Sequence, residues 1–130
     1  MNEDDSHSDL QIVVVGPCAA GKSTLVGNLR PKGYKIKACA QEHSFIPQLW
    51  AKLSKADILI FLDAALPIIA QRQKRNDWTQ AALDEQHRRL AYARACCDLY
   101  FGTDDLTREQ VAERVERFLQ ARGVKPRLNA

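Results

Sequence analysis

Residues 16–23 of this chain read Gly16-Pro17-Cys18-Ala19-Ala20-Gly21-Lys22-Ser23. The stretch fits the pattern G-x-x-x-x-G-K-[ST], in which a glycine-rich loop surrounds the phosphate groups of a nucleotide. Before it, the apolar and β-branched residues 10–15 predict a strand, and after it residues 24–30 can form a helix. A strand, a glycine-rich turn and a helix are the setting in which this pattern binds phosphate, so the sequence predicts a nucleotide site here.

The residue types in this loop suit the chemistry of a bound triphosphate. Backbone N–H groups along residues 16–23 would surround the β-phosphate, and the dipole of the following helix would favour negative charge. Glycine at positions 16 and 21 permits torsions and close approaches that a Cβ atom obstructs. Lys22 would reach the β- and γ-phosphates, and the Ser23 hydroxyl would help to coordinate Mg²⁺. The expected nucleotide-binding residues of the loop are Gly16, Pro17, Cys18, Ala19, Ala20, Gly21, Lys22, Ser23 and Thr24.

The composition is that of a globular domain with an excess of positive charge. A length of 130 residues with 45% apolar and 27% charged residues indicates one domain with a real core. Four acidic residues fall in the first ten positions, so the rest of the chain has 19 basic against 12 acidic residues. That excess suits a polyanionic ligand such as a nucleotide, whereas no motif for nucleic-acid binding is present. Without an apolar run of membrane-spanning length or a signal peptide, we expect a cytoplasmic protein that does not contact membranes.

Alternating strand and helix patterns predict an α/β domain. The expected strands cover residues 10–15, 34–39, 57–62 and 99–101. The expected helices cover 24–30, 45–54 and 67–76, and a long helix runs from an interruption at 77–79 to about residue 97. A last helix follows the capping box at residues 107–110 and ends before Gly123. This alternation implies a three-layer α/β/α fold with a parallel sheet of about four strands. We expect a disordered acidic tail at 1–9, a nucleotide-binding domain at 10–122 and a short tail at 123–130.

The four cysteines show no spacing that is typical of a metal site. Cys18, Cys39, Cys96 and Cys97 form no C-x-x-C pair, so we expect free thiols. Cys18 lies inside the phosphate-binding pattern, and its oxidation could therefore block the nucleotide.

With these features the chain resembles the small P-loop kinases, which include the nucleoside monophosphate, shikimate and adenylylsulfate kinases. The resemblance is carried by residues 16–23, a strand at 58–63 that leads to a helix, a long helix after Trp78, and the ending at residues 98–104. It implies a minimal kinase-like fold that binds ATP or another nucleoside triphosphate with Mg²⁺ and transfers the γ-phosphoryl group to an acceptor. It also implies that Arg72 and Arg75 stabilise the transferred phosphoryl group and that Thr103 belongs to a loop near the nucleotide base.

The chain departs from those kinases where they bind the phosphate acceptor. Only about twenty residues, 34–54, occupy that stretch, and the lid at 74–80 is short. The phosphate acceptor could therefore be a small molecule or a protein, or the chain could have no acceptor. A second hypothesis is a nucleotide-dependent switch that hydrolyses slowly and binds a protein partner. Two copies of the chain could also complete the site as a homodimer.

Two acidic residues are candidates for the metal site and for catalysis. Glu42 follows the second strand, which by the topology of the resembled kinases lies beside the strand of the phosphate loop. There it would act as a general base or bind the Mg²⁺ shell. Asp63 ends an apolar strand, as the metal-site aspartate of many nucleotide-binding proteins does, although it could equally form a loop hydrogen bond. We therefore expect Lys22, Arg72, Arg75 and one of these two acids to be catalytic.

Overall fold

The computed structural model describes residues 10–74 and 77–126. It contains a parallel sheet of four strands in the order β2-β1-β3-β4. The strands are β1 (Ile12–Val15), β2 (Ile36–Ala38), β3 (Ile58–Asp63) and β4 (Leu99–Gly102). The predicted α/β fold with a four-stranded parallel sheet is thereby confirmed. Of the expected tails, residues 1–9 and 127–130 lie outside the described residues.

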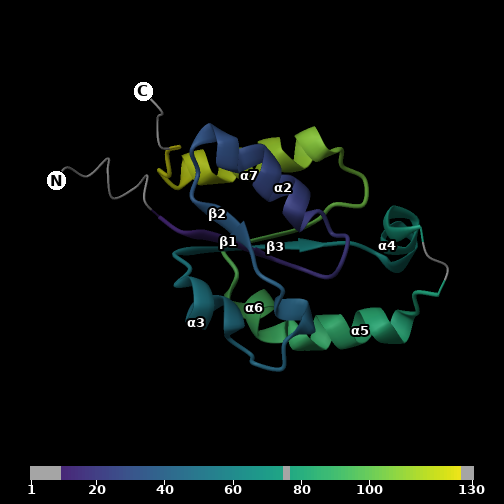
Figure 1. Cartoon of the computed structure of the whole chain (residues 1–130). Coiled ribbons are helices and arrows are strands. Elements are labelled where there is room, and N and C mark those ends of the chain that lie inside the picture. Colours follow the sequence, from purple (N-terminus) through teal and green to yellow (C-terminus); the bar gives the residue numbers. More distant parts are fainter. Residues whose placement is uncertain (1–9, 75–76, 127–130) are drawn as a thin grey trace.

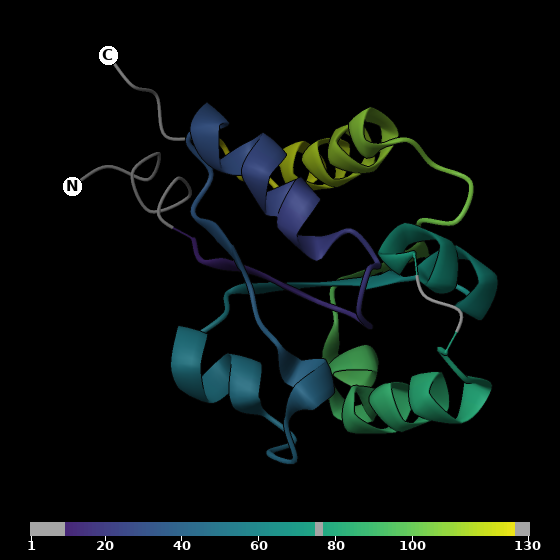
Figure 2. The ribbon, with the colours of Figure 1, turned by 45° about the vertical axis from the view of Figure 1, so that its right-hand side comes forward.

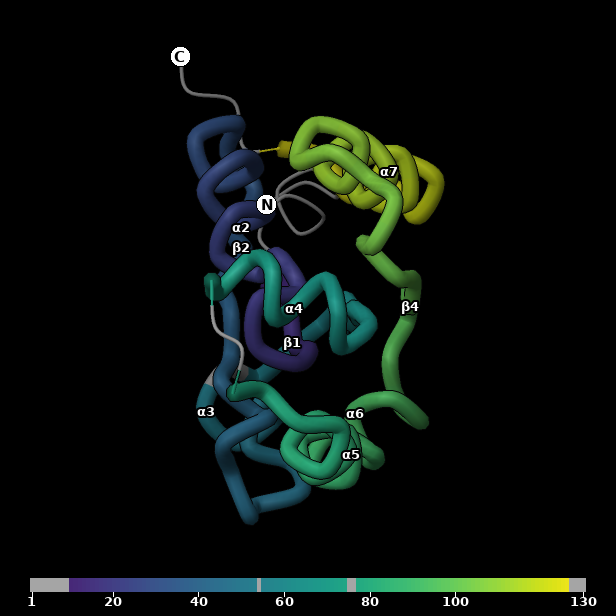
Figure 3. The backbone as a smooth tube through the Cα atoms, turned by 90° about the vertical axis from the view of Figure 1, so that its right-hand side faces the viewer, coloured from purple at the N-terminus to yellow at the C-terminus, as the bar shows by residue number. Residues whose placement is uncertain are grey.

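Helices cover both faces of the sheet and produce three layers (Figures 1 and 2). One layer holds α2 (Lys22–Leu29) and α7 (Arg108–Ala121), and the other holds α3 (Leu49–Ser54), α5 (Gln80–Arg89) and α6 (Ala91–Cys96). Figure 3 shows the sheet between these layers, with α4 (Leu66–Gln73) at the end where β1 and β3 stop. None of the helices in the described part of the chain has the length and apolar character needed to span a bilayer.

The two central strands are apolar on both sides because each face packs under helices. Alternate residues of β1 and β3 belong to two separate clusters of buried side chains, one for each layer. The cluster under α2 and α7 contains Ile12, Val14, Ile58, Ile60 and Leu62. The cluster under α3 and α6 contains Val13, Val15, Leu59 and Phe61. This double burial explains why both strands read as continuous apolar runs in the sequence.

Two helices differ from the lengths that the sequence predicts. The helix expected from residue 45 begins only at Leu49, because the Gln41 amide donates to the Ile46 carbonyl at 2.7 Å and accepts from the Trp50 N–H at 3.3 Å. These two hydrogen bonds keep the residues just before α3 in a turn. The long helix expected from the interruption at 77–79 to about residue 97 is two helices, α5 and α6, separated at Leu90. Leu90 is fully buried, so the break places its side chain in the core.

The last helix begins as its sequence predicts. The Thr107 hydroxyl accepts from the Gln110 N–H at 3.1 Å, and the Gln110 side chain accepts from the Thr107 N–H at 2.8 Å. This reciprocal pair confirms the capping box. After the helix, Gly123 adopts a positive φ of 79° and Val124 is buried in the core. A glycine there lets the chain reverse at the helix end.

Tyr34 gives the fold a predictable weakness at alkaline pH. Its side chain is 3% exposed and its hydroxyl donates to Glu116 Oε2 at 3.2 Å. Burial, followed by the charge of Glu116, raises the pKa of Tyr34 from 10.0 to about 12. Because the unfolded chain loses this proton first as the pH rises, the native state should lose stability between pH 10 and 12, by at most about 1.4 kcal/mol per pH unit.

Tyr34→Phe should flatten this decline, as measured by urea unfolding at a series of pH values between 9 and about 12. The control is Tyr92→Phe, since Tyr92 is an exposed tyrosine on α6. A decline as steep in Tyr34→Phe as in the control would show that Tyr34 does not carry the effect.

Candidate functional site

The loop at residues 16–23 joins β1 to α2 in a conformation that needs its glycines. Gly16 has a φ of 154°, and a Cβ atom there would lie 2.0 Å from the Leu62 carbonyl oxygen. Gly21 has a φ of 106° and directly precedes α2. Ala19 also has a positive φ, of 61°, so the loop alternates between conformations in the way that an anion-binding backbone does. Both glycines therefore have the structural reason that the sequence predicts.

A cavity of about 1140 Å³ opens beside this loop. It lies where the strands of the parallel sheet end, which is the usual ligand position in α/β folds. Its wall combines the loop, the start of α2, the second half of α4, and the segment between β4 and α7. The lining residues include 18–25, Glu42, Ile68, 71–74, Thr103, Asp104, 106–109 and Val111. Residues of the first turn of α2, Ser23 and Thr24, are exposed on this wall.

Lys22 and Glu42 form an ion pair in this cavity. Glu42 belongs to the short 3₁₀ helix η2 (Gln41–His43), which follows β2, and it is 4% exposed. The Lys22 ammonium donates to the Gly16 carbonyl at 2.5 Å. It also donates to Glu42 Oε2. Glu42 Oε1 is buried and has no hydrogen-bond partner within the described part of the chain. The lysine of the loop thus balances a buried carboxylate that retains unused acceptor capacity.

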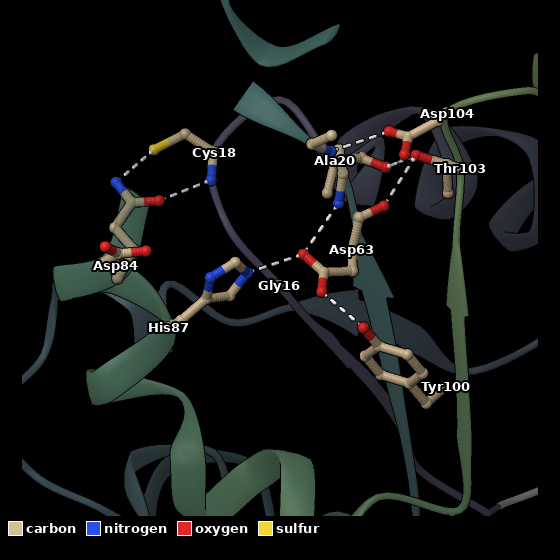
Figure 4. A network of polar contacts seen from close by, with 12 residues as sticks. Gly16, Cys18, Ala20, Asp63, Asp84, His87, Tyr100, Thr103 and Asp104 are labelled. Atoms are coloured by element: carbon tan, nitrogen blue, oxygen red, sulfur yellow. Dashed lines mark hydrogen bonds and ion pairs between the residues drawn. The ribbon is translucent and has the colours of Figure 1, made fainter. Parts of the chain in front are cut away.

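Asp63 lies in a different environment, as Figure 4 shows. Its Oδ1 accepts from the Ala64 N–H at 2.9 Å and lies 2.9 Å from His87 Nε2, and its Oδ2 accepts from the Tyr100 hydroxyl at 2.6 Å. Burial, followed by the hydrogen bond to Asp63, raises the pKa of Tyr100. Asp63 lines a second cavity of about 370 Å³ with His87 and Tyr100. Of the two candidate acids, only Glu42 is therefore paired with Lys22 and placed on the wall of the larger cavity.

Arg72 joins the loop to the end of β4. Its Nη1 donates to the Ala19 carbonyl at 2.8 Å, and its Nη2 donates to the Thr103 carbonyl at 2.9 Å. The Thr103 hydroxyl is buried; it accepts from Arg72 Nη1 at 3.0 Å and donates to the Ala20 carbonyl at 2.8 Å. These contacts join three parts of the cavity wall: α4, the 16–23 loop and the segment after β4. The binding of phosphate by Arg72 and the proximity of Thr103 to a nucleotide base stay predictions. Arg75, which was expected beside Arg72, lies outside the described residues.

Sequence patterns predict no site role for Gln86, which nevertheless contacts the loop. The Cys18 N–H donates to Gln86 Oε1 at 2.9 Å, and Gln86 Nε2 donates to Cys18 Sγ at 3.3 Å. Gln86 is 7% exposed and comes from α5, 68 positions along the chain. Its burial shows only in the structure, and helical periodicity alone does not say which segment a glutamine of this helix meets. All four cysteines are free, as predicted.

The assembled groups can bind an anion and a hard cation side by side. The loop and the first turn of α2 supply backbone N–H groups, and Lys22 supplies a positive charge. The Ser23 hydroxyl and the Glu42 carboxylate are oxygen ligands of the kind that Mg²⁺ prefers. No family model matches this sequence, and no curated protein matches it.

Proposed function

We propose that this chain binds a nucleoside triphosphate, ATP in the first instance, together with Mg²⁺, and transfers the γ-phosphoryl group to an acceptor. The observation that carries the proposal is the position of Lys22, which lies against the 16–23 loop and pairs with Glu42 on the wall of a cavity of about 1140 Å³. A nucleotide needs these same groups close together. The resemblance to the small P-loop kinases supports the same assignment.

Different residues of the cavity would have different roles in phosphoryl transfer. The loop backbone and Lys22 would bind the phosphates, and the lysine would leave Glu42 to do so. Ser23 and Glu42 would hold Mg²⁺, which supplies neutralisation of phosphate charge when it is bound. The unpartnered Glu42 Oε1 fits this role, because a buried carboxylate oxygen without a donor can accept from the water shell of a cation. Glu42 could alternatively accept the proton of the acceptor as a general base.

Substitution of the two acids tests this division. Glu42→Gln should lower Mg²⁺-dependent ADP production from ATP by roughly 100-fold, the range expected for a lost base or metal-site acid. Asp63→Asn should retain most of the turnover, because Asp63 contacts His87 and Tyr100 instead of Lys22. Full activity in both variants would contradict a role for either acid.

One observation favours the second hypothesis, a nucleotide-dependent switch with a protein partner. Phe45 is 81% exposed and Ile46 is 44% exposed, directly after the helix that carries Glu42. The Arg89 guanidinium lies 4.2 Å from the centre of the Phe45 ring, on the same surface. A change at Glu42 would thus reach an apolar surface able to meet another protein. Stimulation of ADP production by an added acceptor supports the kinase, whereas nucleotide-dependent partner binding without stimulation supports the switch.

A further inference from the structure

Three side chains of metal-binding type converge at the edge of the cavity: Cys18, Glu42 and His43. His43 Nε2 lies 3.4 Å from Cys18 Sγ and 3.8 Å from Glu42 Oε2, and Cys18 Sγ lies 4.0 Å from that same oxygen. We propose that these three residues bind a single transition-metal ion of the zinc type. Glu42 is shared with the Mg²⁺ site proposed above, but neither the 16–23 pattern nor the assignment of Mg²⁺ to Ser23 and Glu42 uses the thiol or the imidazole.

The separations fit a tetrahedral ion. Zinc bonds of roughly 2.3 Å to sulfur and 2.0–2.2 Å to nitrogen or oxygen place neighbouring ligand atoms roughly 3.3–3.6 Å apart. The three measured separations are 3.4, 3.8 and 4.0 Å, so binding requires shifts of about 0.5 Å or less. One sulfur, one nitrogen and one carboxylate form a mixed set that suits zinc, whereas magnesium prefers oxygen alone.

The ring orientation of His43 favours a metal site over a catalytic site in which a cysteine and a histidine act as a pair. In such a pair, one ring nitrogen faces the thiol and the other faces the group that orients the ring. Here the same atom, Nε2, faces both Cys18 Sγ and Glu42 Oε2. Three potential ligand atoms that lie within 4.0 Å of one another are the arrangement expected of a coordination site.

The surroundings support the three ligands and leave one position open. Gln86 holds Cys18 through two hydrogen bonds, and such outer partners commonly orient metal ligands. The side chain of His43 is 57% exposed, so solvent reaches the site from that side. Three protein ligands with solvent access resemble zinc sites that keep a fourth position for water or another ligand.

Lys22 competes with the metal for Glu42. Its ammonium donates to Oε2, the oxygen that faces Cys18 and His43. Removal of the ammonium should therefore strengthen metal binding, while removal of a ligand should weaken it. Movement of Lys22 toward a phosphate would have the same strengthening effect, a consequence that rests on the proposed function.

Titration of the full chain with Zn²⁺, without nucleotide and under reducing conditions, tests the site. We expect one ion per chain, with a thiolate absorption band when Co²⁺ replaces Zn²⁺. Cys18→Ser and His43→Ala should each weaken binding by more than the roughly 10- to 100-fold typical of losing an outer partner. Lys22→Ala should bind more tightly than the native chain. Cys96→Ser is the matched control, because Cys96 is an exposed thiol on α6.

Unchanged binding in both Cys18→Ser and His43→Ala would overturn the site, as would the loss of binding in Cys96→Ser alone. Binding of Zn²⁺ no tighter than that of Mg²⁺ would overturn it as well. Far-ultraviolet circular dichroism without metal shows that each variant is folded. Because no nucleotide is present, the outcome does not depend on whether the chain binds ATP.

Discussion

Gly16→Ala is expected to destabilise the fold by more than about 3 kcal/mol, a large part of the stability of a domain this size. The new Cβ atom would lie 2.0 Å from the backbone oxygen of Leu62 and 3.0 Å from its carbonyl carbon. Since Leu62 belongs to β3, relief requires the two central strands to separate or the loop to change its path. The positive φ of 154° adds strain that an alanine does not tolerate well.

Gly27→Ala is the control for this prediction. A Cβ atom at Gly27, in the middle of α2, meets nothing within 4 Å, so the substitution should be neutral or stabilising by up to about 1 kcal/mol. Urea unfolding of both variants measures the difference in the free energy of unfolding. Equal stability of the two variants would mean that the close approach of Gly16 to Leu62 does not constrain the loop.

Lys22→Ala is expected to act on both binding and stability. Affinity for ATP with Mg²⁺ should fall by roughly 100-fold or more, because the charge that we propose to bind the β- and γ-phosphates is lost. Without nucleotide, the variant should also be less stable by roughly 3 kcal/mol, because Glu42 remains buried without its partner. Replacing Glu42 by Gln in the same chain should recover part of that stability, since the uncompensated charge is removed.

The control for Lys22 is Lys52→Ala, an exposed lysine on α3. It should change neither nucleotide affinity nor the free energy of unfolding by more than about 0.5 kcal/mol. Calorimetry and urea unfolding give the two readouts. If Lys22→Ala is as stable as the native chain, the burial of Glu42 does not depend on the lysine. If Lys22→Ala binds ATP as tightly as the native chain, phosphate binding does not depend on the lysine either.

The fold could be predicted from the sequence because its main signals are local. The apolar runs of β1 and β3 indicate strands buried on both faces, and the glycines of the 16–23 loop indicate the turn between β1 and α2. The placement of β2 beside β1, with Glu42 just past it, was expected from the topology of the resembled kinases, and the strand order agrees. The ion pair between Glu42 and Lys22 was not predicted.

The contacts that sequence reasoning missed join residues far apart in the chain. Gln86 reaches Cys18 across 68 positions, and Tyr100 reaches Asp63 across 37. Neither contact follows from spacing or periodicity, because both depend on how α5 and β4 lie against the sheet. His43 meets Cys18 because β1 and β2 are neighbours in the sheet, and no cysteine spacing indicates this contact. The break at Leu90 was missed because local helix propensity continues without a breaker through both helices.

The most direct test of nucleotide binding is calorimetric titration of the native chain with ATP, ADP and GTP, with and without Mg²⁺, beside Lys22→Ala. We expect saturable binding of ATP that is stronger with Mg²⁺ and is lost in the variant. Absence of binding by any of the three nucleotides, or equal binding by the native chain and Lys22→Ala, would contradict the assignment of this cavity to a nucleoside triphosphate.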